Sequence, residues 1–299
     1  MNKKILLPVV KFRSPETHPD KSHAVPAIIV KMQDFLRENG QLNMSAIQNI
    51  RDAGGLHKYL KGAGHIILSP IMPDRLLLKI DYQIYVSLIE ELGPDRYITP
   101  DGITYNGFIK YSRNQIELIL DITSKLLDRF PEYTPIGLVK GCDLSQMDFH
   151  LDNLLERGIT QICLHAGDFL YKESGYSSDR IVGFTRYIRE KVPYMMVYGV
   201  GSKHYFRRFH YADVYVTNSH YMQAFNHKRI QGTKWVNFKG KPTKEIVMKN
   251  FDYLRRLAEG QCDNRDLTEW VPNTPVITMA EPIPNNTVIK TRILKIPGV

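Results

Sequence analysis

Short apolar runs alternate with longer amphipathic segments along most of this chain. The apolar runs, of four to six residues, end in Gly, Asp, Ser, Thr or Asn, and the segments between them carry apolar positions at helical spacing. Residues 192–240 show this most clearly, because one apolar run ends in two glycines, a basic helical segment follows, and a second apolar run ends in polar residues. The alternation predicts parallel strands joined by helices that cover both faces of a sheet.

The pattern also gives a range for each element. Strands are predicted at 1–10, 66–68, 96–101, 135–139, 159–164, 195–198 and 214–216. Helices are predicted at 26–37, 43–52, 76–92, 112–130, 148–158, 181–191, 204–210 and 244–259. Ser112 is expected to cap its helix, and Asp101 is expected to be exposed at the end of its strand. The segment 171–178 is rich in Ser, Gly and Tyr and is either a lid or a plain surface loop.

At least five repeats of strand, polar tip and helix predict an α/β fold. Periodicity alone does not distinguish a closed barrel from an open sheet, but no GxGxxG opens the first unit, which disfavours an open dinucleotide-binding sheet. The preferred fold is therefore one TIM (β/α)8-type barrel in a single domain over 1–260. Residues 261–299 are expected to form an irregular C-terminal tail that packs on the barrel or reaches a partner.

Charge and cysteine content narrow the class of protein further. Forty Lys and Arg against 31 Asp and Glu give a net charge of +9, which attracts polyanions such as nucleic acid. The three cysteines have no CxxC spacing, so neither a zinc site nor a disulfide framework is suggested, and no cofactor is expected. The apolar run at the start is too short for a signal peptide or a membrane span, so we expect a cytoplasmic protein that does not enter a membrane.

The chemistry is expected at the polar ends of the predicted strands. These ends contain Ser69, Asp101, Lys140 with Gly141, His165 with Gly167 and Asp168, Gly199 with Gly201, and Asp213 with Thr217, Asn218 and Ser219. Glycines let backbone N–H groups approach a flat ligand, and carboxylates accept hydrogen bonds from ring N–H or amino groups, which together suit a purine-like base. Each residue alone is also ordinary turn chemistry, and His165 also fits a purely structural role. Asp213 begins its strand, where it can instead cap the preceding segment or pair with Arg207 or Arg208.

Basic residues cluster after the predicted glycine turn. The segment 204–210 (HYFRRFH) interleaves aromatic and basic residues, a composition that suits stacking on bases but also an amphipathic helix that covers a barrel. Six basic residues extend the charge: Lys228, Arg229, Lys234, Lys239, Lys241 and Lys244. We expect Arg207, Arg208, Lys228 and Arg229 to contact a nucleic-acid backbone.

Six short motifs follow one another in a fixed order. They are GGLHKYL (54–60), ELGPDRYITPD (91–101), IGLVKG (136–141), GITQICLHAGDF (158–169), YGVGS (198–202) and ADVYVTNS (212–219). In order and spacing they resemble GGLHKF, LGSDI with a following Asp, FGIQQG, a strand ending in a Gly pair, MGVG and DMFDCV of the tRNA-guanine transglycosylases. Those enzymes are TIM barrels that exchange guanine in a polynucleotide for a 7-deazaguanine base.

The resemblance implies a double displacement through a covalent glycosyl-enzyme intermediate. Asp101 and Asp213 are the candidate catalytic carboxylates, and Asp101 would also read the N1 and amino edge of the base. The base-binding group would comprise Ser69, Lys140, His165, Gly167, Asp168, Gly199, Gly201 and Asn218. The implied partners are DNA or, less favoured, tRNA, together with a 7-deazaguanine such as preQ0 or preQ1, and a homodimer is left open.

This sequence also departs from the family pattern. The DSGGFQ run would begin at Ser69, where the chain reads SPIMPD, and the family's nucleophilic Asp falls on or near Val216. The zinc motif CxCxxC does not occur, a feature similar to compact viral DNA-guanine transglycosylases, and no metal site is expected. Two alternatives stay open. One is a catalytically silent barrel that binds nucleic acid, and the other is an unrelated barrel enzyme in which Gly199 and Gly201 cradle a phosphorylated substrate.

Overall fold

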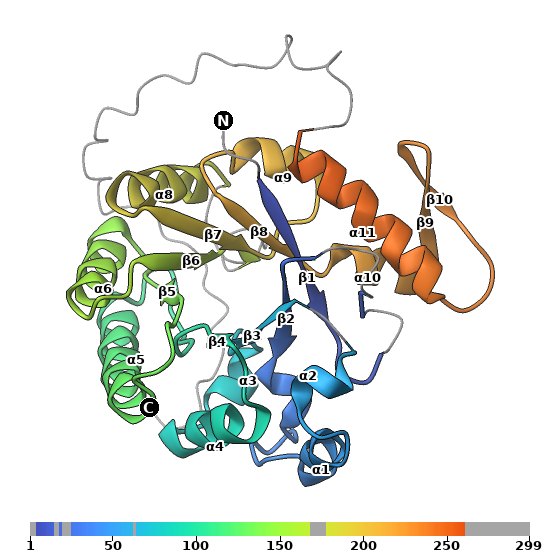
Figure 1. Cartoon of the computed structure of the whole chain (residues 1–299). Helices are drawn as coiled ribbons and strands as arrows, with labels where there is room; N and C mark the ends of the chain where they lie inside the picture. The colour runs from blue at the N-terminus through green and yellow to red at the C-terminus, as the bar shows by residue number, and fades with distance from the viewer. Residues whose placement is uncertain (1–3, 15–17, 20–24, 62–63, 168–177, 261–299) are drawn as a thin grey trace. The chain divides into compact units, whose positions relative to one another are not determined.

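Eight short strands form one curled parallel sheet whose order follows the chain (Figure 1). The computed structural model describes residues 4–14, 18–19, 25–61, 64–167 and 178–260. The strands are β1 (Ile5–Val10), β2 (Ala27–Lys31), β3 (His65–Ser69), β4 (Arg96–Tyr97), β5 (Gly137–Val139), β6 (Gln161–His165), β7 (Tyr194–Tyr198) and β8 (Val214–Thr217), in the order β4-β3-β2-β1-β8-β7-β6-β5. A separate antiparallel pair consists of β9 (Lys228–Gln231) and β10 (Lys234–Asn237).

The curl brings the two edges of the sheet together at a single point. Just beyond β4, Ile98 forms an isolated parallel bridge with Ile136, and the Thr99 N–H donates to the Ile136 carbonyl at 2.9 Å. The bridge does not extend into a ladder, so the ring of strands is not closed there. The architecture is consistent with a TIM-like barrel, and the predicted α/β class is confirmed.

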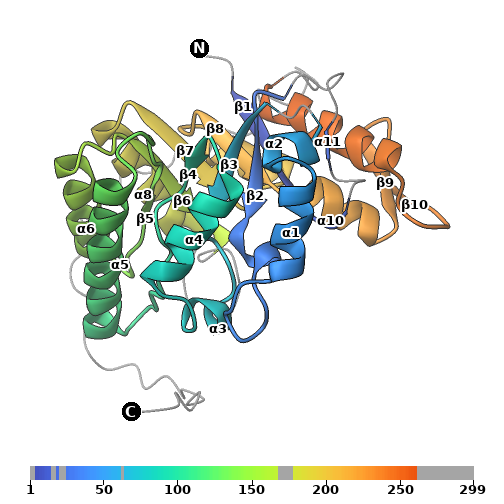
Figure 2. The ribbon, with the colours of Figure 1, turned by 60° about the horizontal axis from the view of Figure 1, so that its bottom comes forward.

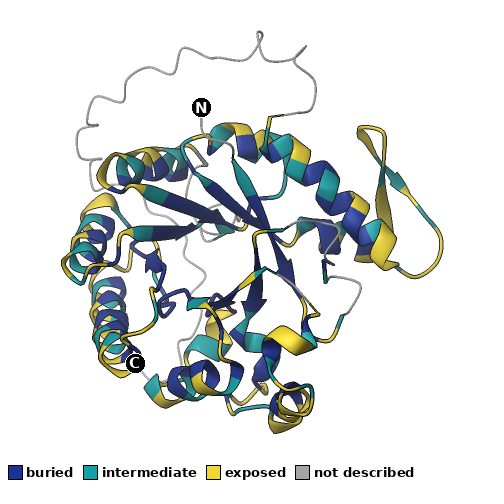
Figure 3. Ribbon diagram, viewed as in Figure 1, coloured by how far each residue is buried: buried dark blue, intermediate teal, exposed yellow. Residues whose placement is uncertain are grey.

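Helices cover the outer face of the curled sheet (Figures 1 and 2). They are η3 (Met32–Phe35), α1 (Met44–Asp52), α2 (Leu56–Tyr59), α3 (Asp74–Leu77), α4 (Tyr82–Leu92), α5 (Ile109–Arg129), α6 (Leu144–Glu156), α8 (Ser178–Lys191), α9 (Lys203–Arg208), α10 (Ser219–Phe225) and α11 (Lys244–Ala258). Most strands are buried on both faces, as Figure 3 shows by colour. This burial explains why they are continuous apolar runs.

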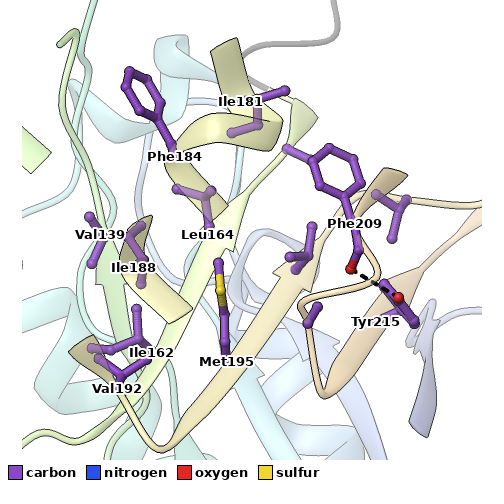
Figure 4. Packing of buried hydrophobic residues seen from close by; sticks show 14 of the residues in the cluster. Val139, Ile162, Leu164, Ile181, Phe184, Ile188, Val192, Met195, Phe209 and Tyr215 are labelled. Carbon is purple, nitrogen blue, oxygen red and sulfur yellow. Dashed lines mark hydrogen bonds between the residues drawn. The ribbon is translucent and has the colours of Figure 1, made fainter. Parts of the chain in front are cut away.

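Alternation along each strand divides the core into an inner and an outer part. Cys163 and Met196 join an inner cluster with residues of the other strands, whereas Ile162, Leu164 and Met195 face the helices. Figure 4 shows the outer packing of β5 to β8 under α8, where the Tyr215 hydroxyl donates to the Phe209 carbonyl at 3.0 Å. The inner side of the curl is therefore packed with side chains.

The helix predicted at 26–37 is wrong. The structure has β2 there, followed by the short 3-10 segment η3. Ile28, Ile29 and Val30 are β-branched and at most 1% exposed, so their run is buried on both faces. Helical spacing of the apolar residues did not distinguish this buried strand from a helix.

Three further expectations are corrected at element ends. The predicted helix 76–92 is interrupted, and α4 starts afresh at Asp81, whose carboxylate accepts from the Ile84 N–H at 3.1 Å. Ser112 is not a cap, because it lies buried within α5 and accepts from the Tyr105 N–H at 3.0 Å. Asp101, which was expected to be exposed, is buried, with 7% of its surface accessible. The proposed lid at 171–178 falls almost wholly outside the described residues.

Two buried histidines give the fold a pH dependence. Burial lowers the pKa of both His150 and His220 to about 3. An unfolded histidine titrates near pH 6.5 and takes up its proton first, so stability is present above that pH and is lost as pH falls toward 3. In His220→Phe, we expect the loss of unfolding free energy between pH 7 and pH 5, from urea titrations, to shrink by about 2 kcal/mol. His204→Phe, which changes an exposed ring, should keep the wild-type pH dependence.

Candidate functional site

At the carboxyl ends of the strands, the inward-facing positions are occupied by polar residues. Ile136, just before β5, and Leu138 within it face inward, so period-two alternation brings Lys140 to the same side. The same continuation leads from Ile29 to Lys31, from Ile67 to Ser69 and from Met196 to Tyr198. We call the group Lys31, Asp34, Ser69, Asp101, Lys140 and Tyr198 the mouth layer. This end of the strands is where parallel α/β folds place their sites.

A buried ion pair joins two members of the mouth layer. The Lys140 ammonium lies 3.0 Å from the Asp101 carboxylate, and their side chains are 6% and 4% exposed. The same carboxylate oxygen of Asp101 accepts from the Gly102 N–H at 2.8 Å. Tyr85 hydrogen-bonds the Asp101 backbone, and burial raises the pKa of its phenol, so Tyr85 stays neutral. The pair therefore holds two opposite charges where little of either side chain is exposed to water.

Tyr198 carries a buried hydroxyl at the end of β7. The side chain is 4% exposed, and its oxygen makes no hydrogen bond of standard geometry to a described residue, although the Ser69 side chain lies beside it as a hydrogen-bonding neighbour and opposes the rise of its pKa. Burial raises its pKa, and Cys163, Asp34 and Asp101 all act on it electrostatically in the same direction. An unsatisfied buried hydroxyl is costly, and a bound polar ligand would satisfy it.

A second pair of opposite charges lies on the β2 side of the mouth layer. Asp34 accepts a hydrogen bond from the Phe12 N–H at 3.2 Å, and burial raises the pKa of Asp34 although Lys31, Lys11 and Arg13 oppose the shift. Burial likewise lowers the pKa of Lys31. Sequence reasoning missed Lys31 and Asp34 because 26–37 was assigned to a helix. The sequence did contain a signal for them, because polar residues follow the apolar run AIIV as they do at the other predicted strand ends.

Neutral groups surround the ion pair and supply no thiolate. His150 Nδ1 accepts from the Lys140 backbone N–H at 3.0 Å and thereby fixes the end of β5. Burial raises the pKa of Cys163, and also that of Cys142, so both thiols stay protonated. Neither of these two thiols is therefore a ready nucleophile.

Three of the predicted glycines lie at the tips of β6 and β7. A Cβ on Gly167 would lie 2.6 Å from His165 Nε2, and Gly199 has a φ of +90°. The His165 ring also packs edge-on against Tyr198, with centroids 5.5 Å apart. The structure thus brings His165, Gly167 and Gly199 together with Tyr198 of the mouth layer.

Gly201 is explained by packing within the protein. A Cβ there would lie 1.8 Å from Ser219 Oγ and 2.7 Å from Thr217 Oγ1, so β7 and β8 approach closely at their tips. We expect Gly201→Ala to lower the free energy of unfolding by about 1–3 kcal/mol, measured by urea unfolding. Gly183→Ala in α8, where nothing lies within 4 Å of the new Cβ, should instead raise it by about 0.5–1 kcal/mol.

Asp213 is not brought to the mouth layer. It precedes β8 and so lies at the opposite end of the sheet from Asp101, which follows β4. Its carboxylate accepts from the Met195 N–H at 2.9 Å and pairs with Arg189 at 3.4 Å, in place of the expected Arg207 or Arg208. Asp213 thus links β7, β8 and α8. The expectation that both candidate carboxylates lie in one site is therefore wrong.

The remaining predicted residues do not belong to the mouth layer or lie outside the described residues. Asn218 is exposed at the start of α10, and Asp168 lies outside the described residues. In α9, Phe206 is buried, and Phe209 directly after it is buried as well, so this segment is an amphipathic cover of the sheet. Arg208 pairs with Asp179. Lys228 and Arg229 are exposed on β9.

The fold and the site define the class of this protein only broadly. It is an α/β protein whose curled parallel sheet carries a buried, charged layer at the carboxyl ends of its strands. No protein-family model matches the chain, and no curated protein matches it. None of the described helices is both long and apolar enough to cross a membrane. In the described ranges, no three His, Cys, Asp or Glu side chains form a group that could hold a metal ion.

Proposed function

We propose that this protein exchanges bases in nucleic acid and replaces guanine, in DNA rather than tRNA, with a 7-deazaguanine. One observation carries the proposal: the buried Asp101–Lys140 pair lies at the carboxyl ends of the strands, near the unsatisfied hydroxyl of Tyr198. The motif resemblance between residues 54 and 240 supports it independently, because Asp101 matches a family carboxylate. In this proposal the barrel is of the TIM (β/α)8 type.

Asp101 is the proposed nucleophile. Its carboxylate attacks C1′ of the target nucleotide while the bond from C1′ to guanine breaks, and a covalent glycosyl ester forms. Lys140 keeps the carboxylate ionised before the attack and stays as a buried cation beside the ester. The incoming base then forms its own bond to C1′, and Asp101 is released.

Asp34 is the proposed proton carrier for both halves of the exchange. Burial raises the pKa of Asp34, which favours the proton-carrying form that would deliver a proton to the departing guanine. The resulting carboxylate accepts the ring N–H proton of the incoming base, which restores the starting state. Ser69, His165 and the Tyr198 hydroxyl supply polar contacts to the base, and Gly167 and Gly199 let its ring approach the backbone.

Release of labelled guanine tests the proposal. The full chain is incubated with duplex DNA or tRNA that carries labelled guanine, together with each of a panel of 7-deazaguanines. We expect release from DNA, and loss of release in Asp101→Asn and Asp34→Asn. Asp213→Asn is the matched control, because this carboxylate lies at the other end of the sheet and release should persist. Full release by Asp101→Asn would contradict the proposed nucleophile.

One observation favours a second candidate, a catalytically silent barrel that binds nucleic acid. Val216, where the family resemblance would place the nucleophile, is fully buried in the inner apolar cluster. In that case the protein binds DNA or tRNA without releasing any label. If the protein neither binds DNA or tRNA nor releases label, both candidates are contradicted. The alternative that then remains is an enzyme that acts on a small phosphorylated substrate.

A further inference from the structure

The hairpin of β9 and β10 stands apart from the repeating strands and helices. In both views it projects beside α10 and α11 at the margin of the fold (Figures 1 and 2). Its register pairs Trp235 with Ile230 and Val236 with Arg229, and Gly232 takes a φ of +60° at the tip. Together β9, β10 and α11 form what we call the basic ribbon, residues 228–259.

The ribbon is held firmly against its own helix. Trp235 packs edge-on against Tyr253 with ring centroids 5.9 Å apart, and the Tyr253 hydroxyl donates to the Thr233 carbonyl at 3.1 Å. Asn250, which is fully buried, accepts from the Ile230 N–H at 2.9 Å and donates to the Lys228 carbonyl at 3.1 Å. These contacts fix which face of the hairpin is turned outward.

The outward face of the hairpin carries exposed basic side chains. Because Ile230 and Trp235 pack inward, alternation turns Arg229 and Lys234 to the opposite side of the hairpin, and both are exposed. The basic ribbon contains nine Lys and Arg against three Asp and Glu. Two of those acids form ion pairs with Lys249 and Arg255. Two hollows lie along the ribbon. Arg229 and Lys249 help to line the first, and Lys249, Arg255 and Arg256 help to line the second.

We infer that the basic ribbon is a docking surface for duplex nucleic acid, separate from the mouth layer. A two-stranded β-ribbon fits the major groove of B-form DNA, and its basic side chains then face phosphates on both sides. An anionic membrane also attracts such charge, but a surface that inserts among lipids carries exposed apolar side chains. Among the described residues, none of the large exposed hydrophobic side chains lies in the ribbon.

Salt-dependent binding tests this inference without any base exchange. Binding of the full chain to a labelled 20-base-pair duplex is measured by fluorescence anisotropy from 50 to 200 mM salt. For Arg229→Gln/Lys234→Gln, two lost phosphate contacts should reduce the slope of log K against log salt by about 1.8 and weaken binding at least tenfold at 100 mM salt. Lys125→Gln/Arg186→Gln, which removes two exposed charges from α5 and α8, should bind like the wild type.

Each outcome of the binding experiment either supports or overturns the inference that the basic ribbon docks duplex nucleic acid. An unchanged slope and affinity in the hairpin variant would overturn the inference, as would hairpin-dependent binding to phosphatidylserine vesicles with none to the duplex. Charge reversal in Arg229→Glu/Lys234→Glu should weaken duplex binding further, and an equal urea unfolding midpoint would show that the fold is intact. Hairpin-dependent duplex binding without guanine release would support this inference while the proposed base exchange fails.

Discussion

Asp101→Ala is expected to lower the free energy of unfolding by about 3–5 kcal/mol. The substitution leaves the Lys140 ammonium, whose side chain is 6% exposed, without the carboxylate that lies 3.0 Å away. An uncompensated buried charge costs several kcal/mol because the interior solvates it poorly. Urea unfolding at pH 7, followed by circular dichroism, measures the loss.

Two further variants show whether that loss comes from the charge itself. Asp101→Ala/Lys140→Met buries no charge and should recover most of the stability. Asp121→Ala removes the carboxylate from a pair with Lys125 whose side chains are about half exposed, and it should cost less than about 1 kcal/mol. If the double variant were no more stable than Asp101→Ala, the ion pair would not explain the effect.

Phe251→Ala should lower the free energy of unfolding by about 3–5 kcal/mol. The side chain is fully buried in the outer core, and its ring packs edge-on against His220 with centroids 5.3 Å apart. Truncation leaves a cavity between α10 and α11, where the hairpin is also attached. Urea unfolding measures the change. The Met222 side chain on α10 is 42% exposed, so Met222→Ala should change the free energy of unfolding by less than about 1 kcal/mol.

Loss of Phe251 also bears on the basic ribbon. Because α11 holds the hairpin through Asn250 and Tyr253, a looser α11 should weaken duplex binding as well as stability. Met222→Ala should leave duplex binding unchanged. A Phe251→Ala variant that is as stable as the wild type would contradict the packing described for the outer core.

Local patterns predicted most of the strands and helices. β3 and the run from β5 to β8 lie at or within a few residues of their predicted ranges, because each is a short apolar run bounded by polar or glycine residues. The hairpin of β9 and β10 was missed. Its residues are mostly exposed, so it lacks the apolar alternation by which strands are found.

The candidate site was predicted only in part. Six of the predicted residues lie at or just after strand ends, and in a parallel sheet these ends lie on one side, so local reasoning reaches them: Ser69, Asp101, Lys140, His165, Gly167 and Gly199. Lys31 and Asp34 were lost with the helix assigned to 26–37. Asp213 was included although it begins a strand, and the start of a parallel strand lies at the opposite end of the sheet.

The sequence by itself determined the alternation of strands and helices and the polar chemistry of the strand ends, because both depend on neighbours within a few residues. Only the tertiary structure decided that Asp101 and Lys140 form one buried pair, that the Tyr198 hydroxyl is buried beside Ser69, and that Arg189 pairs with Asp213. These contacts depend on how far the sheet curls and on which strand lies beside which. Side chains distant along the chain meet there through packing that no local pattern records.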